Sequence, residues 1–136
     1  LTRDPKEMIP SFAKVIPDLK MKDIGYEAHL QLMHYFEVNN IPYTVLDAKN
    51  VLLNPTGVLQ KLCALAEIPF DKAMLSWPIG SRVEDGVWAK YWYDNVHASK
   101  GFNTHKPKNE DFPEQLKPLL NECEPLYDQL VKKALK

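Results

Sequence analysis

Two residues near the start of the chain have the chemistry of an anion site. Arg3 ends a short strand-like start and precedes a helix that Asp4 can cap, and Ser11 lies seven residues after that cap. Because seven residues make about two helical turns, the Ser11 hydroxyl points along the face that Arg3 overlooks. A guanidinium can clamp a phosphate, and a helix N-terminus adds free N–H groups. The alternative is that Arg3 pairs with Asp4 or Glu7 at the surface and that the serine only faces solvent.

The histidines and cysteines give weaker patterns. His29 and His34 are five residues apart on an expected helix, so their directions differ by about 140° and a shared metal site is not expected. His97 lies in an irregular segment and is more typical of a structural histidine than of a catalytic one. Cys63 and Cys123 fall on apolar stripes, where free cysteine behaves as a small hydrophobic residue. Neither belongs to a CxxC pair or a disulfide framework, which favours a reducing, cytoplasmic setting.

Composition argues against two classes of partner. Seventeen Lys and Arg residues against 18 Asp and Glu residues give a formal net charge of −1, which provides no field for nucleic-acid or acidic-membrane binding. The longest apolar run, residues 62–66, is far shorter than the ~20 residues of a membrane-spanning helix. A chain of 136 residues is expected to form one domain.

The order of the elements that position these residues predicts an α/β fold. Helices are expected over residues 5–15 and 24–38, the second ending at two asparagines. Residues 43–47 form a β-branched and aromatic run typical of a buried parallel strand, and Asn54-Pro55 begins a further helix. Strand, helix, helix and strand in this order indicate a parallel sheet with covering helices.

The second half of the chain is expected to be less regular. Residues 77–111 show no dominant period and are rich in aromatic residues, and the rings of 88–93 either stack on a ligand or cover the core. Acidic pairs at 84–85 and 110–111 have no obvious partner, so solvated surface is expected for both. A long leucine stripe predicts a C-terminal helix over 113–135.

The beginning of the chain resembles a known nucleotide-binding segment. The sequence LTRDPKEMIPS at 1–11 is similar to the R-[ND]-P-x-[DE]-x-x-x-S segment of P-loop sulfotransferases. The sequences YTVLD at 43–47, LLNPTGVL at 52–59 and IPF at 68–70 are similar, in order and spacing, to this family's strand, its L-x-x-[DN]-P helix start and its [LI]-P-F run.

Two further elements extend the resemblance to residues 1–102. WPIG at 77–80 and EDGVW at 84–88 resemble a branch of sulfotransferase-like proteins. The resemblance implies the C-terminal part of a three-layer P-loop-type fold with a parallel sheet, helix-rich in this segment. The whole chain, 1–136, would then be a single partial domain.

The resemblance also implies a cofactor and the residues that hold it. The family uses 3′-phosphoadenosine 5′-phosphosulfate (PAPS) and leaves 3′-phosphoadenosine 5′-phosphate (PAP). Its Arg, and the Ser eight positions later, grip the 3′-phosphate, and Arg3 and Ser11 occupy these positions. Arg82 is carried over to the same phosphate, although better-known members place an R-K-G triplet there.

The family's remaining catalytic parts have no counterpart in the sequence. Its Gly-rich loop cradles the 5′-phosphosulfate and lies upstream with a catalytic Lys and His, whereas the five glycines here are scattered. We therefore expect a missing N-terminal half as the partner of this chain and no catalysis by the chain alone. The parent would transfer a sulfuryl group from the nucleotide to a small-molecule acceptor's hydroxyl or amine.

Two other functions stay open at this point. A non-catalytic interaction module, or a degenerate relative that has lost donor binding, keeps the fold without the reaction. A P-loop nucleotide kinase or hydrolase is less favoured, because the matched Arg and Ser belong to 3′-phosphate recognition.

Overall fold

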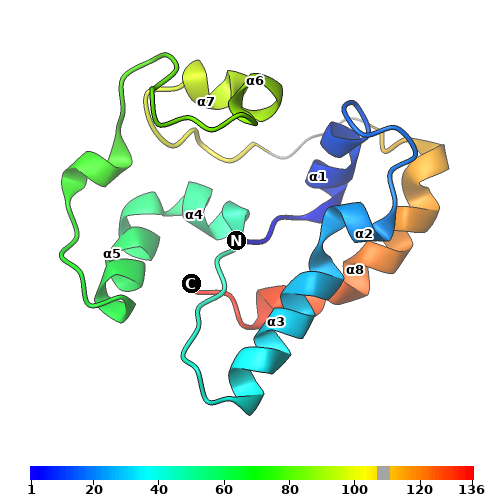
Figure 1. Cartoon of the computed structure of the whole chain (residues 1–136), viewed down its shortest axis with the longest axis horizontal. Helices are drawn as coiled ribbons and strands as arrows, with labels where there is room; N and C mark the ends of the chain where they lie inside the picture. The colour runs from blue at the N-terminus through cyan, green and yellow to red at the C-terminus, as the bar shows by residue number, and fades with distance from the viewer. Residues whose placement is uncertain (107–110) are drawn as a thin grey trace. The chain divides into compact units, whose positions relative to one another are not determined.

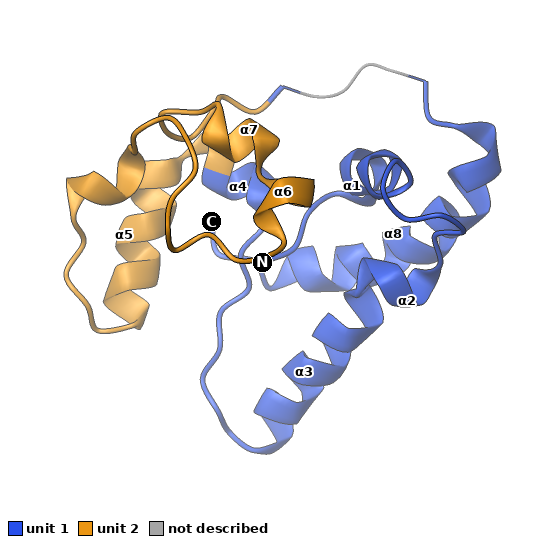
Figure 2. Cartoon of the chain, turned by 45° about the horizontal axis from the view of Figure 1, so that its top comes forward, with its two compact units in different colours: residues 1–51, 106–136 blue, residues 52–105 orange. Residues whose placement is uncertain are grey.

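The computed structural model describes residues 1–106 and 111–136 and is helix-rich, with 55% of residues helical. The chain forms two compact units: unit 1 comprises Leu1–Val51 and Lys106–Lys136, and unit 2 comprises Leu52–His105 (Figure 2). Within the described ranges, no helix is both long enough and apolar enough to cross a membrane.

The first helix begins where the sequence predicts and ends earlier. In α1 (Pro5–Phe12), the Asp4 side chain accepts a hydrogen bond from the Lys6 N–H at 2.8 Å, and a proline fills the first position. Beyond Phe12 the N–H groups of Lys14 and Val15 bond three residues back, so the predicted end of the helix is a set of turns.

The predicted helix over 24–38 is confirmed over 26–38, and a separate short helix precedes it. Gly25 adopts a left-handed conformation, with φ of 86°, and separates α2 (Met21–Ile24) from α3 (Tyr26–Val38). Glycine reaches this conformation without the clash that a Cβ atom causes. The predicted end at Asn39 and Asn40 is confirmed, and Asn40 has a positive φ of 54°.

Three extended segments of unit 1 lie side by side in parallel. Thr2 is bridged to Asp47, and Val45 is bridged to Ala134. The Thr2 N–H donates to the Leu46 carbonyl at 2.7 Å. The Leu135 N–H donates to the Val45 carbonyl at 2.9 Å. The predicted pairing of the chain start with residues 43–47 is confirmed, but the described residues hold only isolated bridges and no continuous sheet.

Helix α8 (Lys117–Lys132) completes the core of unit 1, after a 3-10 turn, η2 (Glu114–Leu116). It packs against α1 and α3, which the ribbon shows beside it (Figure 1). The leucine stripe that predicts this helix supplies its buried face. The buried members of this core are Ile9, Ile24, Tyr26, Met33, Val45, Leu120, Cys123, Leu130 and Ala134.

Unit 2 is built around α5 (Pro55–Leu65), which Asn54 caps through the Gly57 N–H at 3.0 Å. A helix that the sequence did not predict, α4 (Ala48–Leu53), precedes it across the boundary between the units. Farther along the chain come η1 (Lys72–Leu75), α6 (Ala89–Trp92) and α7 (Asp94–His97). Segment 77–106 is therefore largely irregular, as expected, while 107–110 of the predicted segment lie outside the described residues.

Candidate functional site

The main chain of Arg3 is fixed on both sides. The preceding residue, Thr2, is bridged to Asp47. The Tyr26 hydroxyl donates to the Arg3 carbonyl oxygen at 2.6 Å, and the Tyr26 side chain is 1% exposed. Burial raises the pKa of Tyr26, so this hydroxyl keeps its proton and acts as a donor. Tyr26 therefore holds Arg3 at the point where the chain enters α1.

The Arg3 side chain is oriented by a carboxylate one helical turn away. Its Nε and Nη2 atoms donate to the same Glu7 oxygen, Oε2, at 3.1 and 3.0 Å. The Arg3 side chain is 46% exposed and that of Glu7 is 13% exposed. The predicted surface pairing of Arg3 with Glu7 is thus confirmed.

Ser11 lies on the same helix as Glu7, the partner of Arg3. Glu7 and Ser11 are four residues apart in α1, so their side chains lie on one helix face, whereas Arg3 precedes the helix. Arg3 and Ser11 are both exposed to solvent. Glu7 therefore pairs with Arg3 and lies one helical turn before Ser11.

The N-terminus of α1 offers no free N–H group in this structure, contrary to the prediction. Pro5 has no N–H, and that of Lys6 donates to the Asp4 carboxylate. The N–H groups of Glu7 and Met8 both donate to the Asp4 carbonyl oxygen at 3.1 Å. An anion at this face must be bound by side chains.

Arg82, the third predicted site residue, belongs to unit 2. Its side chain is exposed, and its backbone N–H donates to the Asp85 Oδ2 atom at 2.8 Å. Arg82 and Asp85 both line a cavity of about 450 Å³. The surroundings of Arg82 are therefore the residues that line this cavity.

A histidine–aspartate pair lies on the same cavity. The distance from His97 Nε2 to Asp85 Oδ2 is 2.8 Å, and the two side chains are 24% and 19% exposed. The hydrogen bonds from the Arg82 N–H and from His97 hold the pKa of Asp85 below its usual range. The prediction that Asp85 is solvated surface without a partner is wrong, while Glu110 of the other acidic pair lies outside the described residues.

Comparison with known proteins gives the family of this chain. Residues 1–134 match the family described as "Sulfotransferase domain". The chain belongs to the sulfotransferase domain family. No solved structure matches it.

Two curated relatives of this sulfotransferase domain come from Arabidopsis thaliana. They are named branched-chain-amino-acid aminotransferase-like protein 2, with 34% identity over 130 residues, and protein 1, with 37% identity over 130 residues. Each match covers 96% of this chain but 23% of the relative. The chain therefore spans about a quarter of the length of these relatives.

The sulfotransferase domain also has a buried polar pair that sequence reasoning did not single out. The Tyr127 hydroxyl donates to the Asp47 Oδ1 atom at 3.2 Å, and Asp47 is 3% exposed. Burial raises the pKa of Tyr127, and the nearby Asp47 raises it further. The position of Asp47 at the carboxyl end of the expected strand was the available signal, because ligands of α/β sheets bind at that edge.

The cysteines and aromatic residues of the sulfotransferase domain have different surroundings. Cys63 and Cys123 are buried and unbridged, and burial raises the pKa of the Cys123 thiol to about 11. Both therefore behave as the small hydrophobic residues that were predicted. In segment 88–93, by contrast, Trp88 is 67% and Tyr91 is 54% exposed, so these two rings do not cover a core.

Proposed function

We propose that this sulfotransferase domain binds PAPS and its product PAP, with Arg3 and Ser11 holding the 3′-phosphate. The observation that supports this is Glu7, which holds the Arg3 guanidinium and lies one helical turn before the exposed Ser11 hydroxyl. PAPS supplies the sulfuryl group, which passes to a hydroxyl or amine of an acceptor. The residues of this chain bind and orient the nucleotide.

The Arg3–Glu7 pair is compatible with phosphate binding. Nε and Nη2 point to Glu7, whereas Nη1 has no partner among the described residues. A guanidinium held by a carboxylate on one side presents its remaining donors in a fixed direction. Glu7 therefore acts as a positioning residue for Arg3, and the phosphate takes the free donors together with the Ser11 hydroxyl.

The proposal includes the finer expectations about the family's fold and setting. The three bridged segments of unit 1 would belong to the parallel sheet of a three-layer P-loop-type fold. The resemblance also assigns Arg82, in unit 2, to the nucleotide phosphate, and this assignment stays a prediction. The two buried, unbridged cysteines agree with a cytoplasmic setting.

The printed name of the two plant relatives points to another reaction, transamination. That name belongs to whole proteins, and this chain covers 23% of the length of each. The match to the sulfotransferase domain covers residues 1–134, which is nearly the whole chain, so the proposal follows the domain.

Calorimetric titration of the full-length protein that carries this domain, with PAP and with ATP, tests the proposal. PAP should bind more tightly than ATP, and Arg3→Ala should weaken PAP binding by about 1.5–3 kcal/mol, the usual contribution of a hydrogen bond to a charged group. Ser11→Ala should weaken it in the same range. Lys22→Ala, which removes an exposed positive charge from α2, is the matched control and should leave the affinity unchanged.

Two outcomes would contradict the proposal. Equal PAP affinity of the wild type and Arg3→Ala would remove the assignment of Arg3. A folded full-length protein that binds no PAP would favour the non-catalytic interaction module, and tighter binding of ATP would favour the kinase or hydrolase class.

A further inference from the structure

Unit 1 has a cavity of its own, on a face of α1 that the proposed nucleotide site does not use. Its volume is about 360 Å³, within the ~300–1,000 Å³ that small-molecule sites usually have. One wall is formed by α1 and the turn after it, and the other by residues 111–116, all within unit 1. Lys6 and Pro10 line this cavity, whereas Glu7 and Ser11 do not. Because neighbouring residues of a helix point about 100° apart, these two pairs lie on different faces of α1.

The apolar part of the lining comes from both walls. It consists of Pro10, Ala13, Phe112, Pro113 and Leu116. Phe112 and Leu116 also pack against the buried core of unit 1, which supports them from the other side. The Leu116 N–H donates to the Pro113 carbonyl at 3.0 Å, and the Ala13 N–H donates to the Ile9 carbonyl at 3.0 Å. Both walls are therefore preorganised surfaces against which an apolar group can lie.

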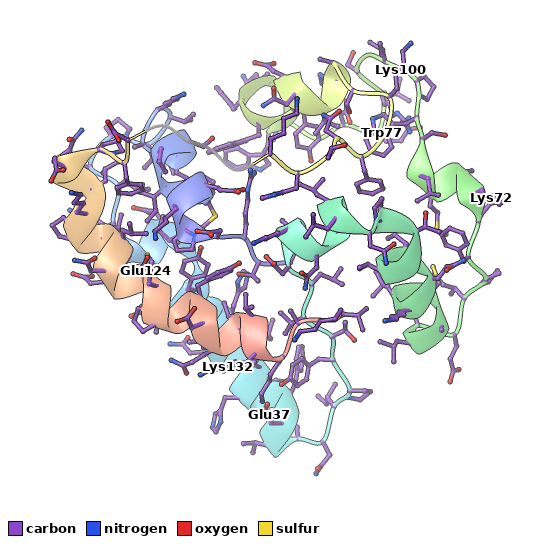
Figure 3. All side chains as sticks on the ribbon, turned by 180° about the vertical axis from the view of Figure 1, so that it is seen from behind. Glu37, Lys72, Trp77, Lys100, Glu124 and Lys132 are labelled. Atoms are coloured by element: carbon purple, nitrogen blue, oxygen red, sulfur yellow. The ribbon has the colours of Figure 1, made fainter. Side chains whose placement is uncertain are left out.

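Charged groups of both signs line the same cavity. They are Lys6, Lys14 and Asp111. The Lys6 Nζ atom lies 3.3 Å from Oε1 of Glu124, which Figure 3 labels on α8, so the charge of Lys6 is already compensated. Lys14 and Asp111 are exposed and have no hydrogen bond or ion pair within residues 1–106 and 111–136. The cavity therefore presents one uncompensated cation and one uncompensated carboxylate beside an apolar surface.

This combination distinguishes between ligands by their charge. Lys14 attracts a simple anion and Asp111 repels it, and the two effects are reversed for a simple cation. A molecule that carries both charges is attracted by both side chains. An apolar group on the same molecule gains further free energy by leaving water for the apolar lining. An α-amino acid with an apolar side chain has all three of these features.

We propose that this cavity binds an α-amino acid with an apolar side chain. The ligand carboxylate accepts from the Lys14 ammonium group, and the ligand ammonium group donates to the Asp111 carboxylate. The ligand side chain lies against Phe112 and Leu116. The inference goes beyond the nucleotide site, because the lining contains none of the residues proposed for that site and needs no nucleotide.

L-phenylalanine and two of its derivatives test the proposal on the full-length protein that carries this domain. N-acetyl-L-phenylalanine keeps the carboxylate without the charged amine, and L-phenylalaninamide keeps the charged amine without the carboxylate. Each is titrated without nucleotide at about pH 6, where an α-amino group is protonated. The methyl resonances of Ala13 and Leu116 report the dissociation constants, so ligand bound elsewhere on the protein is not counted. Both derivatives should bind more weakly than L-phenylalanine.

Two variants each remove one of the uncompensated charges. Lys14→Gln should weaken L-phenylalanine binding by about 2- to 10-fold, the range from an exposed ion pair to a hydrogen bond with a charged group. It should not weaken binding of L-phenylalaninamide, which has no carboxylate. Asp111→Asn should weaken L-phenylalanine binding in the same range, but not that of N-acetyl-L-phenylalanine. Lys22→Gln and Asp128→Asn remove exposed charges that do not line the cavity, and these matched controls should change none of the affinities.

Three results would overturn the proposal. They are the absence of Ala13 and Leu116 shifts with L-phenylalanine, unchanged L-phenylalanine binding in both variants, and equal weakening of L-phenylalanine and L-phenylalaninamide by Lys14→Gln. The dispersed methyl resonances of the core of unit 1 show in the same spectra whether each variant is folded. Because no nucleotide is present, a failure here leaves the PAP titrations unaffected, and the reverse also holds.

Discussion

Two carboxylates of this domain each hold a basic partner in a defined direction. Glu7 accepts from Arg3 one helical turn away, and Asp85 accepts from His97. The Arg3 side chain is nearly half exposed, so solvent screens its attraction to Glu7 and the pair adds little to stability. The main consequence of both pairs is therefore orientation, of a guanidinium in one case and of an imidazole in the other.

The stability of unit 2 should depend on pH through Asp85. Its pKa is lower in the folded chain than in the unfolded chain, because the Arg82 N–H and His97 stabilise the carboxylate. This stabilisation is present above the usual carboxyl pKa and is lost as the pH falls through the depressed value. The difference in melting temperature between the wild type and Asp85→Asn should therefore shrink below about pH 4.

Tryptophan fluorescence measures this effect, because the three tryptophans of the chain, Trp77, Trp88 and Trp92, all lie in unit 2. Glu84→Gln is the matched control. A difference between wild type and Asp85→Asn that stays constant down to pH 2 would contradict the role given to the Asp85 carboxylate.

Residue patterns predicted local pairs and missed distant ones. The pairing of Arg3 with Glu7 follows from their separation of four residues. Asp85 and His97 are twelve residues apart in irregular sequence, so only the folded loop shows that they meet. The occupied N–H groups of α1 could have been foreseen, because Asp4 and Pro5 are the residues that cap and begin such a helix.

At the scale of elements, helix starts were predictable and helix divisions were not. Asp4 and Asn54 cap α1 and α5 as their sequences indicate, since a side-chain oxygen followed by proline is a strong start signal. The helix predicted from residue 24 begins at Tyr26, because Gly25 separates it from the short helix α2 that ends at Ile24. Periodicity reports the face of a helix but not a change in backbone direction at one residue.

Substitution of Gly25 by alanine should destabilise unit 1 through the backbone alone. Its φ is 86°, and no atom lies within 4 Å of an added Cβ, so a steric clash with neighbours is absent. An L-residue in the left-handed region costs about 1–2 kcal/mol. Denaturant titration followed by far-ultraviolet circular dichroism should show this loss in the free energy of unfolding.

Gly86→Ala provides the control for this prediction. Gly86 also has no atom within 4 Å of an added Cβ, and its φ lies outside the left-handed range. The alanine should therefore cause no loss of stability there. Equal losses of unfolding free energy in the two variants would show that the left-handed conformation of Gly25 does not cause the loss.

At the scale of the whole molecule, unit 1 is assembled from both ends of the chain. Helix α8 covers α1 and α3, and Ala134 after it is bridged to Val45. The leucine stripe predicted the helix but not its partners, because periodicity contains no information on distant contacts. The order of elements predicted a parallel arrangement of the chain start with residues 43–47, whereas the third segment at 134–135 was not predicted.

Leu130→Ala should test how strongly α8 closes this unit. Leu130 is 1% exposed, and truncating a buried leucine removes contacts and leaves a cavity, at a cost of about 2–5 kcal/mol. Val38→Ala, at a side chain that is 64% exposed on α3, should change the free energy of unfolding by less than about 0.5 kcal/mol. Similar small effects of both would mean that α8 is not needed for the core.

In the proposed function, Arg3 and Ser11 recognise the 3′-phosphate of the nucleotide. Calorimetric titration of the full-length wild-type protein with PAP and with adenosine 5′-phosphate tests this claim most directly, since the two nucleotides differ only in that group. One hydrogen bond to a charged group contributes about 1.5–3 kcal/mol, so PAP should bind at least about 10-fold more tightly. Equal affinities for the two nucleotides would contradict the claim.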